Sequence, residues 1–187
     1  MQNHNKLIIF SGPSGVGKGS IIKRLFLNKK LNLTFSISAT TRKKRKHEVD
    51  KKDYYFISKE KFKLFIAQNK FIEFAIYENN YYGTLKSEIE NKFLKNKNVV
   101  LDVDFRGKKQ IDNTDFKSIS FFILPRNIND LNLRLQKRNS ESNVEIKNRL
   151  QRAHEELKYK NNYQFLIIND SIKKSVQQIE WILLKNL

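Results

Sequence analysis

The sequence predicts an α/β fold in which helices flank a mainly parallel sheet. Strands that are buried on both faces are apolar almost throughout. Four short runs have this character: Leu7–Phe10, Val99–Leu101, Phe121–Leu124 and Phe165–Ile168. Apolar residues at helical spacing occur at positions 146, 150, 153 and 157 and again at 172, 176, 179 and 183. Strands and helices that alternate in this way are typical of a doubly wound core.

The first apolar run leads into a glycine-rich turn, and a helical pattern follows over 18–28. A strand, a G-x-x-x-x-G-K turn and a helix in this order bind the phosphates of a nucleotide. Backbone N–H groups point at the anion, and Lys18 adds a mobile positive charge. A plain turn with a solvated lysine is the weaker interpretation. The predicted nucleotide-binding loop comprises Gly12, Pro13, Ser14, Gly15, Val16, Gly17, Lys18, Gly19 and Ser20.

Gly19 stands where many such loops carry a serine or threonine that binds Mg²⁺. Ser20 lies about 100° further round the helix, so its hydroxyl cannot simply replace the missing one. We therefore expect Mg²⁺ to be held through water and the nucleotide's own oxygens, without a direct protein ligand. This arrangement suits an ion that loses its waters reluctantly.

Residues 34–93 interrupt the alternation of core strands and helices. Aromatic-rich runs at 54–56 and 71–77 predict a small sheet of its own, with a helix between them. A second helix, with positions 85, 89 and 93 on one face, leads back to the core. We therefore expect this segment to be an insertion, placed at the sheet edge where ligands bind in open α/β folds.

Residues 42–46 are five consecutive cations, of which we interpret the three lysines as solvated. Arg42 and Arg45 lie three apart, and Tyr54 follows them. Guanidinium groups match phosphate oxygens with two parallel hydrogen bonds, and a tyrosine hydroxyl can add a further donor. The sequence therefore predicts a second phosphate site here.

Six segments resemble the guanylate kinase family in their order and spacing: SGPSGVGK, SATTRKKRKHE, KDYYF, FIEFAIYENNYYGT, VVLDVDFRG and IIND. The likeness covers nearly the whole chain. It implies phosphoryl transfer from ATP to GMP, with Mg²⁺ as cofactor and dGMP as a further expected acceptor. It also implies a P-loop core (1–33, 94–128 and 160–187), an inserted GMP-binding subdomain (34–93) and a helical lid (129–159).

The resemblance further implies roles for individual residues. The GMP phosphate and neighbouring parts of the site are implied for Ser38, Arg42, Arg45, Glu48, Tyr54 and Tyr82. The guanine is implied to face Ser38, Glu73, Thr84 and Asp104, with Asp102 close to GMP and the metal. Asn169, within IIND, is implied to contact ATP. The implied catalytic residues are Lys18, Arg42, Arg138 and Arg149, and lid closure delivers the last two.

Hydrogen-bonding chemistry agrees with the guanine assignment. Guanine presents N1–H and N2–H as donors beside the acceptor O6. An ionised Glu73 only accepts, whereas Thr84 or Ser38 can donate to O6. Adenine would turn its bare N1 toward the carboxylate and leave a buried charge unpaired. An exposed carboxylate on a sheet edge is the weaker alternative, because Glu73 lies between Ile72 and Phe74.

Composition restricts the class of protein. The chain has 187 residues and no cysteine, which excludes disulfides and thiolate metal sites. No apolar run approaches the ~20 residues that cross a bilayer, and no signal peptide is recognised, so we expect a cytoplasmic location without a membrane partner. The net charge of +18 permits nucleic-acid binding, but the basic residues are spread along the chain. Nucleic acid is therefore not an expected partner, and monomer and homo-oligomer both stay open.

Two other functions stay open at this point. A guanylate-kinase-like interaction domain that binds peptides without catalysis typically lacks a working phosphate loop, and here residues 12–18 are intact. A basic nucleic-acid-binding protein is favoured by charge alone, and its binding would weaken steeply with salt.

Two departures from the family pattern are Arg106, in place of a common glutamine, and Asn139-Ser140, in place of Gly-Thr.

Overall fold

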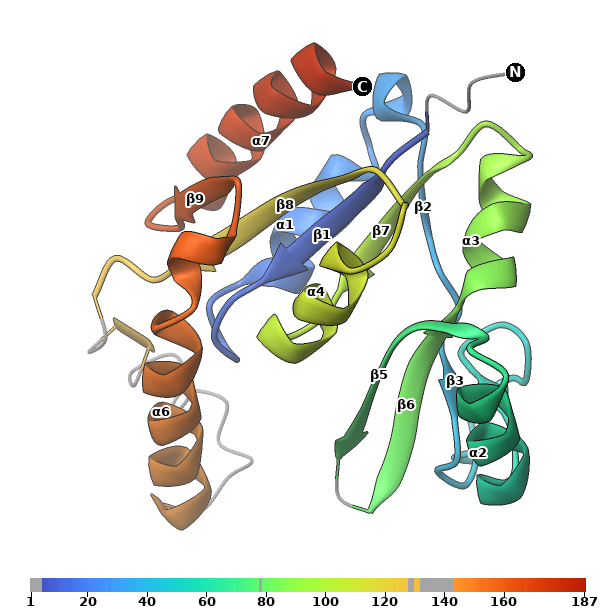
Figure 1. The fold of residues 1–187 in the computed structure, drawn as a ribbon. Coiled ribbons are helices and arrows are strands. Elements are labelled where there is room, and N and C mark those ends of the chain that lie inside the picture. Colours follow the sequence, from blue (N-terminus) through green and yellow to red (C-terminus); the bar gives the residue numbers. More distant parts are fainter. Residues whose placement is uncertain (1–4, 78, 128–129, 132–142) are drawn as a thin grey trace.

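The computed structural model describes residues 5–77, 79–127, 130–131 and 143–187. Five parallel strands form the core sheet in the order β2-β7-β1-β8-β9 (Figure 1). They are β1 (Leu7–Ser11), β2 (Leu33–Phe35), β7 (Asn98–Asp102), β8 (Ser118–Leu124) and β9 (Phe165–Ile168). The α/β fold with a parallel core is therefore confirmed.

Helices cover both faces of this sheet, which explains why the central strand is apolar from Leu7 to Phe10. One face carries α1 (Lys18–Leu25) and α7 (Ile172–Asn186), and the other carries α3 (Lys86–Phe93) and α4 (Phe105–Asp112). Along β1, Ile8 and Phe10 belong to the first hydrophobic cluster, whereas Leu7 and Ile9 belong to the second. Alternate side chains of a strand point to opposite faces, so the apolar run fills two cores at once.

A second sheet is formed by the inserted segment, in the order β4-β3-β6-β5. Its strands are β3 (Ala39–Thr40), β4 (Tyr55–Phe56), β5 (Phe71–Tyr77) and β6 (Asn80–Leu85). The helix α2 (Lys59–Ala67) starts where Ser58 accepts a hydrogen bond from the Lys61 N–H, and it buries Phe62 against Phe71 and Ala39. The predicted small sheet with its own helix is present.

Two details differ from the sequence expectations. The helix that follows the glycine-rich loop ends at Leu25 instead of Asn28, because Asn28 caps the short 3₁₀-helix η1 (Lys29–Leu31) and accepts from Lys30 N–H. The strand β2 was not predicted, since it has only three residues, of which Leu33 and Thr34 are partly covered and Phe35 is exposed. It pairs with β7 and so belongs to the core sheet.

The remaining described elements lie between β8 and β9 along the chain. They are α6 (Asn143–Leu157) and the 3₁₀-helix η2 (Lys160–Asn162). Figure 1 shows α6 and the inserted sheet on either side of the carboxyl end of β1, with α4 between them. Within the described residues, no helix has both the length and the apolar character that a membrane span requires.

Candidate active site

The phosphate loop adopts a conformation that its glycines make available. Gly12 has φ 135° and Gly17 has φ 103°, both in the region that side chains disfavour. A Cβ on Gly12 would lie 2.3 Å from the carbonyl oxygen of Ile123, and one on Gly17 would lie 2.5 Å from Asn169 Nδ2. The loop therefore fits tightly against β8 and against the segment that follows β9.

Lys18 begins α1 and folds its side chain back over the loop. Its Nζ donates to the carbonyl oxygen of Gly12 at 2.6 Å and lies 3.9 Å from Asp102 Oδ1. No side chain caps the N-terminus of α1, and no acidic residue occupies its first turn. Unpaired N–H donors and the positive end of the helix dipole are therefore directed at the place where an anion would bind.

The two positions after Lys18 lie at the surface. Both Gly19 and Ser20 are exposed, and a Cβ on Gly19 would meet nothing within 4 Å. The described part of the chain holds no group of three or more acidic or histidine side chains that could cage a metal ion.

Asn169 lies beneath the loop and is 1% exposed. Its Nδ2 donates to the Val16 carbonyl oxygen at 2.8 Å, and its Oδ1 accepts from Ser175 Oγ at 3.1 Å. These hydrogen bonds connect the loop to the segment after β9 and to α7, so Asn169 stabilises the conformation of the loop in the structure described.

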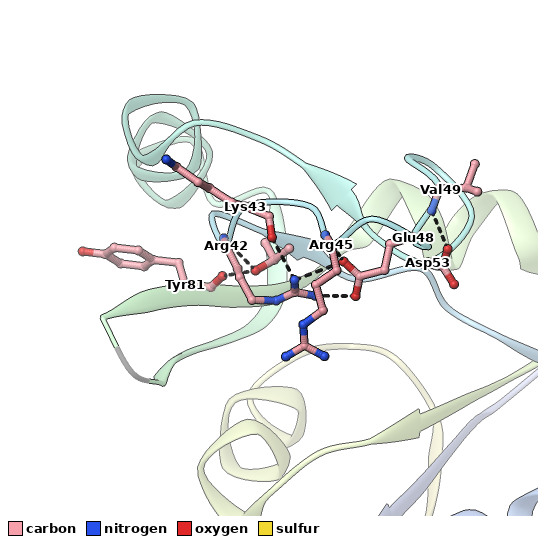
Figure 2. A network of polar contacts seen from close by, with 8 residues as sticks. Arg42, Lys43, Arg45, Glu48, Val49, Asp53 and Tyr81 are labelled. Atoms are coloured by element: carbon pink, nitrogen blue, oxygen red, sulfur yellow. Dashed lines mark hydrogen bonds and ion pairs between the residues drawn. The ribbon is translucent and has the colours of Figure 1, made fainter.

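The predicted phosphate-binding arginines form a network with Glu48 (Figure 2). The guanidinium of Arg42 donates to both carboxylate oxygens of Glu48, at 2.7 and 3.0 Å, and the Arg45 N–H donates to the same carboxylate at 2.8 Å. The Arg42 hydrogen bonds, followed by that of the Arg45 N–H, lower the pKa of Glu48 to about 2. Figure 2 shows the Arg45 side chain extending away from this carboxylate.

Aromatic side chains surround the same network. The guanidinium of Arg42 lies 5.5 Å from the centre of the Tyr54 ring and 5.8 Å from that of Phe56. The rings of Tyr54 and Tyr82 meet edge to face at 6.2 Å. The structure therefore brings Arg42, Glu48, Tyr54 and Tyr82 together, with Arg45 free to reach outward from them.

Glu73 lies in β5 opposite Thr84 in β6 and is 7% exposed. Burial raises the pKa of Glu73, while hydrogen bonds from the side chain and backbone of Thr84 oppose that rise. Gly107 leaves room for the carboxylate, since a Cβ there would lie 3.2 Å from Glu73 Oε2. Ser38 is partly covered at the start of β3, and its carbonyl oxygen accepts from the Tyr55 N–H.

The aspartate that ends β7 and the one that follows it have different surroundings. Asp102 keeps a side chain that is 45% exposed and faces the Lys18 ammonium. Desolvation of the carboxyl by the surrounding protein raises the pKa of Asp102, and the positive charge of Lys18 opposes the rise. Asp104 caps α4, because its Oδ1 accepts from the N–H groups of Arg106 and Gly107. Its Oδ2 accepts from the Arg106 guanidinium, with Nε at 2.8 Å.

A cavity of about 510 Å³ lies next to the phosphate loop, the end of β5 and the start of α4. Its lining includes Ser14 of the loop, Tyr77 of β5, Asp104 of the α4 cap and Arg149 of α6. The predicted catalytic Arg149 therefore faces the cavity, whereas Arg138 lies outside the described residues.

Glu156 also lines this cavity, and sequence reasoning missed it. Burial raises the pKa of Glu156 to about 7, and the positive charge of Lys18 opposes that rise. A glutamate among the many charges of α6 carries no sequence signal that separates it from its solvated neighbours. Only the position of α6, across the cavity from the start of α4, assigns it to the site.

Comparisons with known proteins agree with the motifs. The family model for guanylate kinase matches residues 4–186. The guanylate kinase of Mycoplasmoides gallisepticum is 44% identical over 186 residues, which cover 99% of this chain and 95% of the relative. That of Porphyromonas gingivalis is 43% identical over 176 residues, with 93% and 94% covered.

A solved structure shares the fold as well. The crystal structure of guanylate kinase from Anaplasma phagocytophilum superposes with a TM-score of 0.70 at 26% identity, covering 97% of this chain and 85% of the other. A loop shaped for phosphates, a buried carboxylate in β5 and full-length relatives at this level of identity lead to one conclusion. The chain belongs to the guanylate kinase family.

Proposed function

We propose that this chain transfers the γ-phosphoryl group of ATP to GMP and releases ADP and GDP, with dGMP as a second acceptor. The observation that carries the proposal is the cavity of about 510 Å³ bordered by the phosphate loop, β5, the α4 cap and α6. A donor nucleotide on the loop and an acceptor beside Glu73 would meet across it. We further propose a cytoplasmic location, as the family's role in nucleotide metabolism implies.

Selection of guanine rests on Glu73 and its neighbours. The carboxylate accepts from N1–H and N2–H of guanine, and the Thr84 or Ser38 hydroxyl donates to O6. Because Glu73 is 7% exposed, a base that offers no donors leaves a buried charge unpaired. Asp104 contributes negative potential next to Glu73 while it caps α4.

Binding of the GMP phosphate rests on Arg42, Arg45, Tyr54 and Tyr82. Glu48 holds Arg42 through two hydrogen bonds, so its planar fork is oriented before the substrate arrives. The Arg45 guanidinium, which does not pair with Glu48 in Figure 2, supplies the fork that meets the phosphate. Because these charged side chains are already positioned, less side-chain conformational freedom is lost when GMP binds.

Phosphoryl transfer requires positioning and charge stabilisation more than covalent chemistry. Lys18 exchanges its hydrogen bond with the Gly12 carbonyl for the β- and γ-phosphates. Arg149, and Arg138 when the lid closes, neutralise charge that spreads over the γ-oxygens in the transition state. Asn169 keeps the loop in shape by its hydrogen bond to Val16.

The residues present fit a magnesium ion that keeps its water. Bound with ATP, Mg²⁺ would neutralise charge on the β- and γ-oxygens. Asp102, whose side chain is 45% exposed, would accept hydrogen bonds from the ion's waters. Gly19 offers no hydroxyl, in agreement with binding through water and phosphate.

The experiment that tests the proposal is an assay of ADP release with ATP and Mg²⁺, comparing GMP, dGMP, AMP, dTMP and CMP as acceptors. We expect turnover with GMP and dGMP and little with the others. A chain that binds GMP but releases no ADP would support the interaction-domain alternative. Binding to oligonucleotides that falls steeply with salt, without turnover, would support the nucleic-acid alternative.

A further inference from the structure

Gln110 joins the core helix α4 to the inserted sheet. Its Oε1 accepts from the Phe74 N–H at 3.0 Å, and its Nε2 donates to the Phe74 carbonyl oxygen at 2.8 Å. The strand β5, which contains Phe74, is an edge of its sheet. The side-chain amide therefore satisfies both backbone groups on the outer side of that residue, as a neighbouring strand would.

The same helix face also contacts the preceding residue of β5. A Cβ on Gly107 would lie 3.2 Å from Glu73 Oε2, and Gly107 and Gln110 are three positions apart, so they lie on one face of α4. The helix therefore borders the Glu73 carboxylate and holds the backbone of Phe74.

The strand pairing next to Glu73 is irregular. The pairing of β5 with β6 shifts register between Phe71 and Glu73. A bulge of this kind bends a strand and changes the direction of nearby side chains. A contact from outside the sheet, placed one residue after Glu73, is well situated to determine where the carboxylate points.

We propose that Gln110 is a positioning residue for base selection, because its two hydrogen bonds to Phe74 set the place of the Glu73 carboxylate relative to the core. This inference rests on the proposed function. Gln110 also donates to the Arg106 carbonyl oxygen at 3.3 Å within its own helix. Hydrogen bonds to both β5 and α4 therefore fix the orientation of its amide.

The test compares two glutamines that change in the same way. Gln110→Met keeps the length of the side chain and removes both hydrogen bonds to Phe74. The matched control is Gln164→Met, because Gln164 Oε1 accepts from the Ser120 N–H at 2.9 Å far from the base site, between β8 and β9. For each variant, kcat/KM with GMP and with AMP, the KM for ATP and the thermal unfolding midpoint are measured.

We expect Gln110→Met to lower kcat/KM for GMP by about tenfold, the effect of about one net hydrogen bond of positioning. The GMP:AMP ratio should fall with it, while the KM for ATP stays within about twofold. Gln164→Met should lower the unfolding midpoint and leave the ratio unchanged. A ratio that is unchanged in Gln110→Met, or that falls equally in Gln164→Met, overturns the inference.

A second variant decides the case in which Gln110→Met does not fold. Gln110→Glu keeps the acceptor for the Phe74 N–H and turns a carboxylate oxygen toward the Phe74 carbonyl, so the ratio should again fall. An unchanged ratio in this variant also overturns the inference. Wild-type protein without GMP turnover would remove the proposed function and this inference together, whereas normal wild-type turnover with an unchanged variant ratio removes only the role of Gln110.

Discussion

Replacement of Glu73 by glutamine should move stability and substrate use in opposite directions. In the free protein, burial raises the pKa of this carboxyl, because the charged form loses part of its hydration in the folded state. Glutamine has the same size, carries no charge and keeps an oxygen that can accept from Thr84. The unfolding midpoint at pH 7 should therefore stay the same or rise.

Use of GMP should fall, because the carboxylate accepts from two donors of guanine. Glutamine keeps one acceptor and sets an NH₂ donor against the other guanine donor. One charge-assisted hydrogen bond becomes neutral and one is lost, which together cost about 2–4 kcal/mol. This corresponds to a fall in kcat/KM for GMP of about 30- to 900-fold. AMP should lose much less, because its N1 is an acceptor.

The assay measures ADP release at saturating ATP while GMP or AMP is varied, together with thermal unfolding. Glu90→Gln is the control, since Glu90 is an exposed glutamate on α3. If Glu73→Gln reduced GMP and AMP turnover by the same factor, or lowered the unfolding midpoint, then Glu73 would support the fold instead of selecting the base.

Three further changes test other parts of the site. Lys18→Met should reduce turnover by at least about a hundredfold and destabilise the fold by only about 1 kcal/mol, for the lost hydrogen bond to Gly12; near-normal transfer would contradict the role of Lys18. Arg45→Lys should weaken GMP binding by about 1–3 kcal/mol, because the planar fork is lost, and an unchanged calorimetric isotherm would refute this assignment. Glu156 has a pKa raised from 4.5 to about 7, so the folded protein binds the extra proton between these values and loses stability as pH rises through them. Glu156→Gln should therefore be more stable than wild type at pH 8, by about 2 kcal/mol once the shift is discounted for the partial solvent exposure of Glu156, with the difference gone below pH 4.5; parallel stability curves at all pH values would contradict it.

Sequence patterns were sufficient to predict the parts of the fold whose residues are determined by burial or by the phosphate-loop motif. The central strand is apolar from Leu7 to Phe10 because helices cover both of its faces, so its sequence predicted a strand buried on both sides. The glycines at positions 12 and 17 were recognised from their spacing, and their left-handed φ angles agree with that interpretation. The edge strand β2 escaped notice because three residues carry too short a pattern.

Contacts between distant segments could not be predicted in the same way. The cap that Asp104 forms on α4 and its ion pair with Arg106 depend on the local geometry after β7. The hydrogen bonds of Gln110 join positions 36 apart in the chain, and glutamine in a helix is usually a solvated residue. Such contacts follow from the packing of α4 against β5, which no periodicity in either segment specifies.

The strand order has a consequence for how the protein folds during synthesis. The phosphate loop follows β1, whose partners are β7 and β8, with Leu7 opposite Val99 and Ser118. By contrast, β5 and β6 form a local hairpin. Contacts between distant positions form slowly because a long loop must close first. The loop is thus among the first parts of the site to leave the ribosome, and it should be among the last to gain protection in pulsed hydrogen exchange, after the hairpin of the inserted sheet.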